Sequence, residues 1–282
     1  MTLGRTQAAA QLESRGLSPR RSLGQNFVVD ANTVRRIARL AGVGPGDHVV
    51  EVGAGLGSLT LALAETGAQV LAVEIDQHLI PILQQNTEAC TDVTVRHADA
   101  MDLDWHALLA GSPSWTLVAN LPYNVATPLI ADILDLVPEI TTLLVMVQKE
   151  VGERLVAAAR SEAYGAVSVK VAYWATSALV GLVPPSVFLP RPNVDSALVR
   201  IDRRSEPAIG PEVDREGLFA LVRTGFGQRR KMLRRSLSGL VDAEAFERAG
   251  VEPTARAEEL DVFAWGRLAA AAAAAPTGVD AS

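Results

Sequence analysis

The feature that most constrains the fold is a glycine-rich segment directly after a short apolar run. Gly53, Gly55 and Gly57 stand at alternate positions behind Val49–Val52, and an apolar helical face follows over residues 59–64. This order predicts a strand, a tight turn and a helix. Glycine suits such a turn because a Cβ would block both the sharp turn and a close approach to a ligand. A ligand is therefore expected at the helix N-terminus, although a purely structural glycine turn would show the same pattern.

An acidic residue at the end of the next apolar run makes the ligand hypothesis more specific. Residues 70–75 predict a second buried strand that carries Glu74 near its end. Glu74 follows Gly53 by about 20 residues, the spacing at which a carboxylate accepts the ribose hydroxyls of a nucleoside cofactor. Together the two features indicate a nucleoside-binding site.

Length and composition place the chain among globular proteins. Its 282 residues can form one large and one smaller domain. It has no run of eighteen apolar residues and no charged-then-apolar leader pattern, so we expect a cytoplasmic protein without a membrane partner. One cysteine and four histidines without metal-ligand spacing predict neither an internal disulfide nor a metal site.

The charge is distributed unevenly along the chain. The net charge is −6, which alone argues against a nucleic-acid partner. However, residues 1–39 hold seven arginines against two acids, and residues 223–235 hold six basic residues and no acid. Each segment alone could be a solvated face, but two basic segments around an acidic nucleotide fold favour nucleic-acid binding. The candidate RNA-binding residues are Arg20, Arg21, Arg229, Arg230, Lys231, Arg234 and Arg235.

A further candidate site residue follows the predicted strand at residues 93–97. Asp99 comes just after that strand, where ligands bind in open α/β sheets, and could accept a hydrogen bond from an adenine amino group. A turn or cap role is the alternative for such a loop aspartate.

The most informative segment is Asn120-Leu121-Pro122-Tyr123, directly after a predicted strand at residues 115–119. The exocyclic amine of adenine is a poor nucleophile because its lone pair is delocalised into the ring. The Asn120 side-chain oxygen and the Leu121 carbonyl could accept its two N–H groups and free that lone pair. Pro122 would fix the direction of the Leu121 carbonyl, and Tyr123 would stack on the base. A proline turn with a buried tyrosine is the structural alternative.

These motifs resemble the ribosomal RNA adenine N6-dimethyltransferase family. The similarity extends over residues 20 to about 265 and includes segments 23–27, 148–151, 164–165, 188–196 and 226–233. Two positions depart from the family pattern, Val28 for leucine and Ala126 for serine or threonine. The resemblance implies S-adenosylmethionine as cofactor, and Phe188 as the second residue that sandwiches the adenine. It implies that the cofactor is bound by Asn26, the Val28 backbone, Gly53, Gly55, Glu74, Asp99 and Asn120.

The implied fold is an α/β Rossmann-like class I methyltransferase sheet with a smaller C-terminal helical domain. We expect a mobile arm at residues 1–18, the methyltransferase domain at 19–205, a helical RNA-binding domain at 206–275 and a disordered tail at 276–282. For residues 166–174 the alternation predicts a strand, whereas the resemblance implies a helix, which we adopt. The other expected elements are helices at 30–42, 77–86, 213–226, 230–240, 243–249 and 262–275, and strands at 140–147, 179–183 and 196–201, the last one antiparallel.

The resemblance also implies a function. It is the transfer of two methyl groups to N6 of each of two adjacent adenosines in a hairpin near the 3′ end of 16S rRNA, by a monomer acting on an immature small ribosomal subunit. Two alternatives remain. One is a large-subunit rRNA methyltransferase of the macrolide-resistance type, and the other is a ribosome-assembly or RNA-binding factor for which methylation is secondary. A dehydrogenase is disfavoured because hydride transfer has no use for the Asn120 turn.

Overall fold

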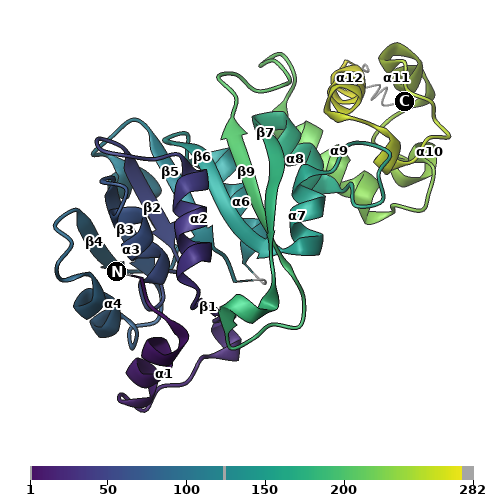
Figure 1. Ribbon diagram of the computed structural model, residues 1–282. Coiled ribbons are helices and arrows are strands. Elements are labelled where there is room, and N and C mark those ends of the chain that lie inside the picture. Colours follow the sequence, from purple (N-terminus) through teal and green to yellow (C-terminus); the bar gives the residue numbers. More distant parts are fainter. Residues whose placement is uncertain (1, 123–124, 275–282) are drawn as a thin grey trace. The chain divides into compact units, whose positions relative to one another are not determined.

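The computed structural model of the chain describes residues 2–122 and 125–274 (Figure 1). By its contacts the chain divides into two compact units, Met1–Glu153 with Ser177–Arg203, and Arg154–Thr176 with Arg204–Ser282. Residues 154–176, which we expected in the first domain, therefore belong to the second unit. The physical reason is that Val169 and Tyr173 are buried in the core of the helical unit.

The first unit is built on a seven-stranded sheet. The order across the sheet is β4 (Val93–His97), β3 (Gln69–Glu74), β2 (His48–Val52), β5 (Trp115–Asn120), β6 (Ile140–Gln148), β9 (Ser196–Arg203) and β7 (Ala175–Val183). The strands from β4 to β6 are parallel. As predicted, β9 runs antiparallel to its neighbour, which is β6; Thr142 lies opposite Asp202. The carboxyl ends of the parallel strands thus gather Val52, Glu74 and Asn120 at one edge.

The helices of the first unit are α1 (Arg5–Glu13), α2 (Ala31–Ala41), α3 (Ser58–Ala64), α4 (Ile80–Thr87), α5 (Trp105–Leu109), α6 (Ala126–Leu136) and the start of α7 (Lys149–Val156). Asp30 caps α2 by accepting the Thr33 N–H at 2.7 Å, and the helix ends at Gly42 with φ 70°. Its predicted apolar face is confirmed, since Val34 and Ile37 are buried in one core cluster with sheet residues. α4 begins three residues later than expected, because residues 76–79 form a turn before Pro81 enters the first helical turn.

The segment expected as a mobile arm contains the helix α1. α1 buries Ala8 and Leu12, and Leu3 before the helix joins them in a cluster with Leu79 and Ile82. Gln11 also exchanges two side-chain hydrogen bonds with Asn86 of α4. Only contacts with distant residues explain the order of this segment.

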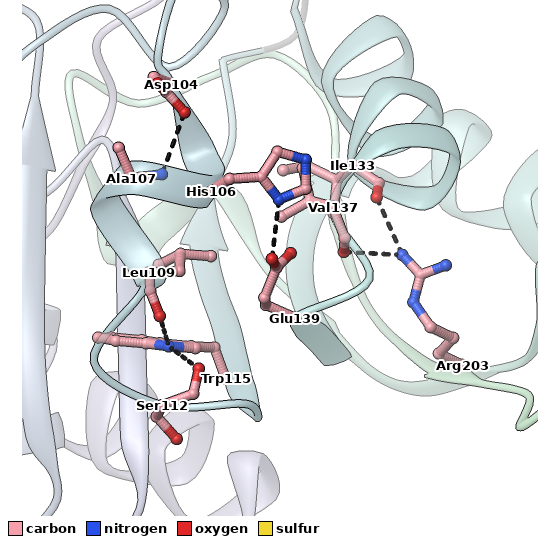
Figure 2. A network of polar contacts seen from close by, with 10 residues as sticks. All are labelled: Asp104, His106, Ala107, Leu109, Ser112, Trp115, Ile133, Val137, Glu139 and Arg203. Carbon is pink, nitrogen blue, oxygen red and sulfur yellow. Dashed lines mark hydrogen bonds and ion pairs between the residues drawn. The ribbon is translucent and has the colours of Figure 1, made fainter.

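Arg203 joins β9 to the end of α6 (Figure 2). Its Nη2 donates to the carbonyls of Ile133 and Val137 at 2.9 and 3.1 Å, and Nη1 donates to Leu134 at 2.9 Å. These carbonyls lie at the C-terminal end of α6, where helix carbonyls run short of backbone partners, although that of Ile133 also accepts the Val137 N–H at 3.0 Å. Nearby, the His106 ring pairs with Glu139 at 2.7 Å. Because β6 begins at Ile140, this network lies at the end of the strand opposite to the Asn120 edge.

The second unit is helical. It contains α8 (Ala166–Trp174), α9 (Arg215–Gly227), α10 (Leu233–Ser236), α11 (Ala243–Ala249), the short η3 (Ala257–Glu259) and α12 (Val262–Ala273). The helix at residues 166–174 is confirmed. The predicted helix at residues 230–240 is wrong, because only α10 forms there. Leu233 and Arg234 donate their N–H groups to Ala255 and Pro253 at 2.7 and 3.0 Å, so these groups are not used in a helix that continues through them.

Within the described residues, no helix is both long and apolar enough to cross a membrane.

Candidate functional site: two joined hollows at the carboxyl edge of the sheet

The glycine segment forms the turn that the sequence predicts. Gly53, Gly55 and Gly57 all have positive φ, at 76°, 59° and 90°. A Cβ on Gly55 would lie 2.9 Å from Cδ1 of Phe27, and one on Gly57 would lie 2.9 Å from Cδ1 of Leu83. Other residues would therefore be strained at these positions and would also clash with packed side chains.

Glu74 ends β3 and is 5% exposed. Its Oε2 accepts the Gly55 N–H at 2.7 Å, and its Oε1 accepts the Asp76 N–H at 2.8 Å. Burial raises the pKa of this carboxyl group. Each oxygen keeps a second lone pair, so Glu74 can hold the glycine turn and still accept hydrogen bonds from a ligand.

Two hollows open at this edge of the sheet and share Leu23, Gly53, Ile75 and Pro122. The first is lined by residues 23–28, the glycine turn, Glu51, Glu74 and residues 120–122. The second is largely apolar and is lined by Val73, Met101 and Leu129 together with Asp99. Asp99 accepts the Met101 N–H at 2.9 Å, so it forms the expected turn and lines a cavity at once.

Asn120 lies at the end of β5 and lines the first hollow. Its Nδ2 donates to the Asn26 carbonyl at 2.8 Å, and no described residue donates to its Oδ1. Leu121 is 2% exposed and donates its N–H to the Met146 carbonyl at 3.0 Å. Pro122 borders both hollows. Tyr123, the predicted stacking residue, lies outside the described residues.

Two further predicted residues, Val28 and Phe188, face each other in a small antiparallel pair. β1 (Phe27–Val28) pairs with β8 (Phe188–Leu189), and Val28 stands opposite Phe188. Val28 lines the first hollow. Phe188 is 1% exposed, packs in a cluster with Leu144, and lines neither hollow. The structure thus brings Asn26 and Val28 to the site but keeps Phe188 in the core behind it.

Comparison with known proteins identifies the family. The family model "Ribosomal RNA adenine dimethylase" matches residues 16–273. The chain belongs to the ribosomal RNA adenine dimethylase family. A relative from Cutibacterium acnes, named ribosomal RNA small subunit methyltransferase A, is 48% identical over 92% of this chain and 91% of its own length. A relative of the same name from Kineococcus radiotolerans is 50% identical over 90% of this chain and 86% of its own length.

Solved structures show the same fold. The 23S rRNA methyltransferase ErmE is 28% identical, with a TM-score of 0.67 over 88% of this chain and 99% of that one. A dimethyladenosine transferase from Plasmodium falciparum has a TM-score of 0.71 over 85% of this chain and 94% of that one. At 22% identity the second comparison supports the fold alone. The chain therefore has the Rossmann-like class I methyltransferase fold of its family.

The candidate RNA-binding residues of this chain differ in whether they form ion pairs. Arg229 forms an ion pair with Glu258 and donates Nη2 to the Glu162 carbonyl at 2.6 Å. Arg20 pairs with Asp76 at 3.4 Å. The remaining candidates are exposed and form no ion pair with any described residue: Arg21, Arg230, Lys231, Arg234 and Arg235.

The predicted helix at residues 230–240 would place Arg230 and Lys231 on one face with Arg234 and Arg235, at i, i+4 spacing. Arg230 and Lys231 instead precede α10 and do not share a helix face with them. The exposed cations of residues 230–235 come from a turn and a short helix, and the described residues place no acid in pairing distance of them. The prediction of a cationic surface therefore holds for these four residues, whereas Arg229 is largely committed to a partner within the unit.

Sequence analysis missed two acidic residues near the hollows, Glu51 and Asp76. Glu51 is 1% exposed, and the Thr60 hydroxyl donates to its Oε2 at 2.5 Å. Burial raises the pKa of Glu51 to about 8. The available signal was a carboxylate inside an apolar strand, Val49-Val50-Glu51-Val52. Asp76 is 4% exposed. The sequence gives no signal for it, because an aspartate two residues after Glu74 is what an ordinary turn after a strand would also show.

Proposed function

We propose that this chain transfers methyl groups from S-adenosylmethionine to N6 of adenosines in small-subunit rRNA. The observation that carries the proposal is Asn120, which lies in the same hollow as the glycine turn and Glu74, with its Oδ1 unbonded among the described residues. The relatives at 48% and 50% identity, both named small-subunit rRNA methyltransferases, support the substrate class.

The residues around the hollows fit the cofactor. Glu74 would accept hydrogen bonds from the ribose hydroxyls. Asp99 would accept one from the adenine amino group, and Ile75 and Met101 would provide the apolar lining beside the ring. Asn26, Val28 and the Gly53 and Gly55 backbone would complete the contacts. S-adenosylmethionine supplies an electrophilic methyl group when bound.

Asn120 and Leu121 would activate the target amine. Oδ1 of Asn120 and the Leu121 carbonyl would accept hydrogen bonds from its two N–H groups. The nitrogen lone pair would then be less delocalised into the ring and would point at the methyl group. Pro122 would fix that carbonyl, and Tyr123 would hold the base by stacking. Phe188 lines neither hollow and is not assigned this role. The amine proton becomes acidic only after transfer, so the transition state needs no general base. Positioning and exclusion of water would supply most of the rate.

The substrate adenosine must leave its stack to reach the hollow, and the pocket must admit a monomethylated amine for the second transfer. We propose that the targets are two adjacent adenosines in a hairpin near the 3′ end of 16S rRNA, in an immature small subunit in the cytoplasm, and that the enzyme acts as a monomer. Exposed Arg21, Arg230, Lys231, Arg234 and Arg235 would contact phosphates.

The test is methyl transfer to small subunits from a strain that lacks this gene, with mass spectrometry of the rRNA. We expect N6,N6-dimethyladenosine at two neighbouring positions with the wild type. Asn120→Ala should lower turnover about 10² to 10³-fold, as loss of one preorganised polar group at a reacting centre does, with subunit binding retained. Asn32→Ala, which changes an exposed asparagine on α2, is the matched control.

Other outcomes would point to the alternatives. Methylation of large-subunit rRNA alone would favour the macrolide-resistance type. Tight subunit binding by a wild-type protein that transfers no methyl group would favour an assembly or RNA-binding factor. Tight NAD binding would overturn the cofactor assignment.

A further inference from the structure

We infer that Asp76 is a positioning residue for methyl transfer. It holds residues 20–26, here called the strap, against the cofactor hollow, and through the strap it fixes the side chain of Asn120. The inference rests on the proposed function and adds to it a residue that touches neither the base nor the methyl group.

Asp76 is a buried carboxylate with partners in the strap and in the turn that follows β3. Its Oδ2 accepts Gln25 Nε2 at 2.9 Å, and its Oδ1 lies 3.4 Å from Arg20 Nη1. Oδ1 also accepts the His78 N–H at 3.0 Å. A buried charge needs such partners, and here two of them are strap side chains.

The strap has few other means of attachment. None of residues 20–26 is buried, and the single turn η1 (Arg21–Leu23) buries no side chain. Gln25 also accepts the Arg20 N–H through Oε1 at 2.8 Å, so one side chain closes the strap on itself and on Asp76. Polar contacts with Asp76, rather than apolar packing, therefore keep the strap in place.

The far end of the strap reaches the reacting centre. The Asn26 carbonyl accepts Asn120 Nδ2 at 2.8 Å, and the Asn26 side chain donates to the Gly24 carbonyl at 3.1 Å. This contact turns the Asn120 amide so that Oδ1 is the atom left for the substrate amine. If the strap moved, Asn120 would lose the partner that fixes its orientation.

Asp76 also connects to the ribose acceptor. Its N–H donates to Glu74 Oε1 at 2.8 Å, and Glu74 Oε2 accepts the Gly55 N–H at 2.7 Å. A continuous hydrogen-bonded path thus runs from the glycine turn through Glu74, Asp76 and the strap to Asn120. Asp76 should consequently affect both cofactor affinity and turnover.

The sharpest test is an exchange of partners. Both oxygens of Asp76 accept hydrogen bonds, so Asp76→Asn, which keeps one oxygen, must set its amide donor against either the Gln25 Nε2 donor or the His78 N–H. Gln25→Met removes the Gln25 hydrogen bond at similar side-chain length. The double variant Gln25→Glu with Asp76→Asn restores a donor–acceptor pair, with the carboxylate now on the strap beside Arg20. Glu65→Gln is the matched control, since it removes a carboxylate paired with Arg35 on the surface of the same unit, away from both hollows.

Three readouts separate positioning from simple destabilisation. At a temperature where all variants are folded, each single variant should lower kcat and weaken S-adenosylmethionine affinity, both about tenfold, and should speed trypsin cleavage after Arg20 or Arg21 by a similar factor. The double variant should regain all three to within about threefold of wild type. Glu65→Gln should match wild type.

Single variants with a lower melting temperature but unchanged kcat, cofactor affinity and trypsin rate would overturn the inference. So would a double variant no better than Asp76→Asn alone. A wild type without methyl transfer would refute the proposed function instead, and the trypsin comparison would still decide whether Asp76 holds the strap.

Discussion

Glu51 should make the stability of the unliganded protein fall as pH rises. Its carboxyl group is 1% exposed, and burial raises its folded-state pKa from 4.5 to about 8. The folded protein binds this proton more tightly than the unfolded chain does. The contribution of Glu51 to the free energy of unfolding is therefore full below about pH 4.5 and is lost as pH rises through about 8. Each pH unit within that window removes about 1.4 kcal/mol.

The measurement is unfolding of wild type and Glu51→Gln without cofactor, at several values between about pH 5.5 and 8. Over this interval the free energy of unfolding of the wild type should fall by on the order of 3 kcal/mol relative to that of the variant. The difference corresponds to about 6–12 °C in melting temperature. Glutamine imitates the protonated carboxyl group and can still accept the Thr60 hydroxyl, so the two proteins should be close in stability at the acidic end.

Two comparisons make the result decisive. Thr60→Val should extend the pH-dependent loss of stability to higher pH, because the Thr60 hydrogen bond holds the pKa of Glu51 down. Glu65 should show the opposite pH dependence. Its hydrogen bond with Arg35 lowers its pKa to about 2, so its contribution to stability is present above the unfolded pKa and is lost as pH falls through about 2. Glu65→Gln should therefore follow wild type above about pH 5.5. Parallel curves for wild type and Glu51→Gln would refute the reasoning that Glu51 is buried in its neutral form.

Two other predictions concern the cofactor and the RNA. Glu74→Ala should weaken S-adenosylmethionine binding at least about tenfold. It should also destabilise the fold by roughly 2–6 kcal/mol, since two buried N–H groups lose their acceptor. Calorimetry and urea unfolding check both effects, and unchanged affinity would remove Glu74 from the site. Log affinity for rRNA should fall with log salt with a slope near −3, about −0.7 for each of four exposed cations of residues 230–235. Charge reversal of Arg230 and Arg234 together should flatten that slope by about 1 to 2 units, whereas Arg229→Ala should change it little. An unchanged slope in the double variant would assign RNA recognition elsewhere, foremost to Arg21.

The sequence alone determined the central architecture, because its signals are local. Three glycines after an apolar strand require a tight turn, and their positive φ values agree with that expectation. Glu74 and Asn120 each follow directly on an apolar run, so parallel pairing of these runs brings both residues to one edge. Asp30 before an apolar helical face likewise fixed the start of α2.

Tertiary structure decided what depends on distant partners. The 230–240 segment has helix-forming side chains, yet Leu233 and Arg234 give their N–H groups to Ala255 and Pro253, and the helix shortens to α10.

Ion pairs and side-chain hydrogen bonds also depend on residues far apart in the sequence. The acid that pairs with Arg229 is Glu258, 29 residues further along the chain. Gln25 and Asp76 stand 51 residues apart, and Asn26 and Asn120 stand 94 apart. Spacing along one element cannot reveal contacts of this kind, because they exist only after folding has brought separate segments together.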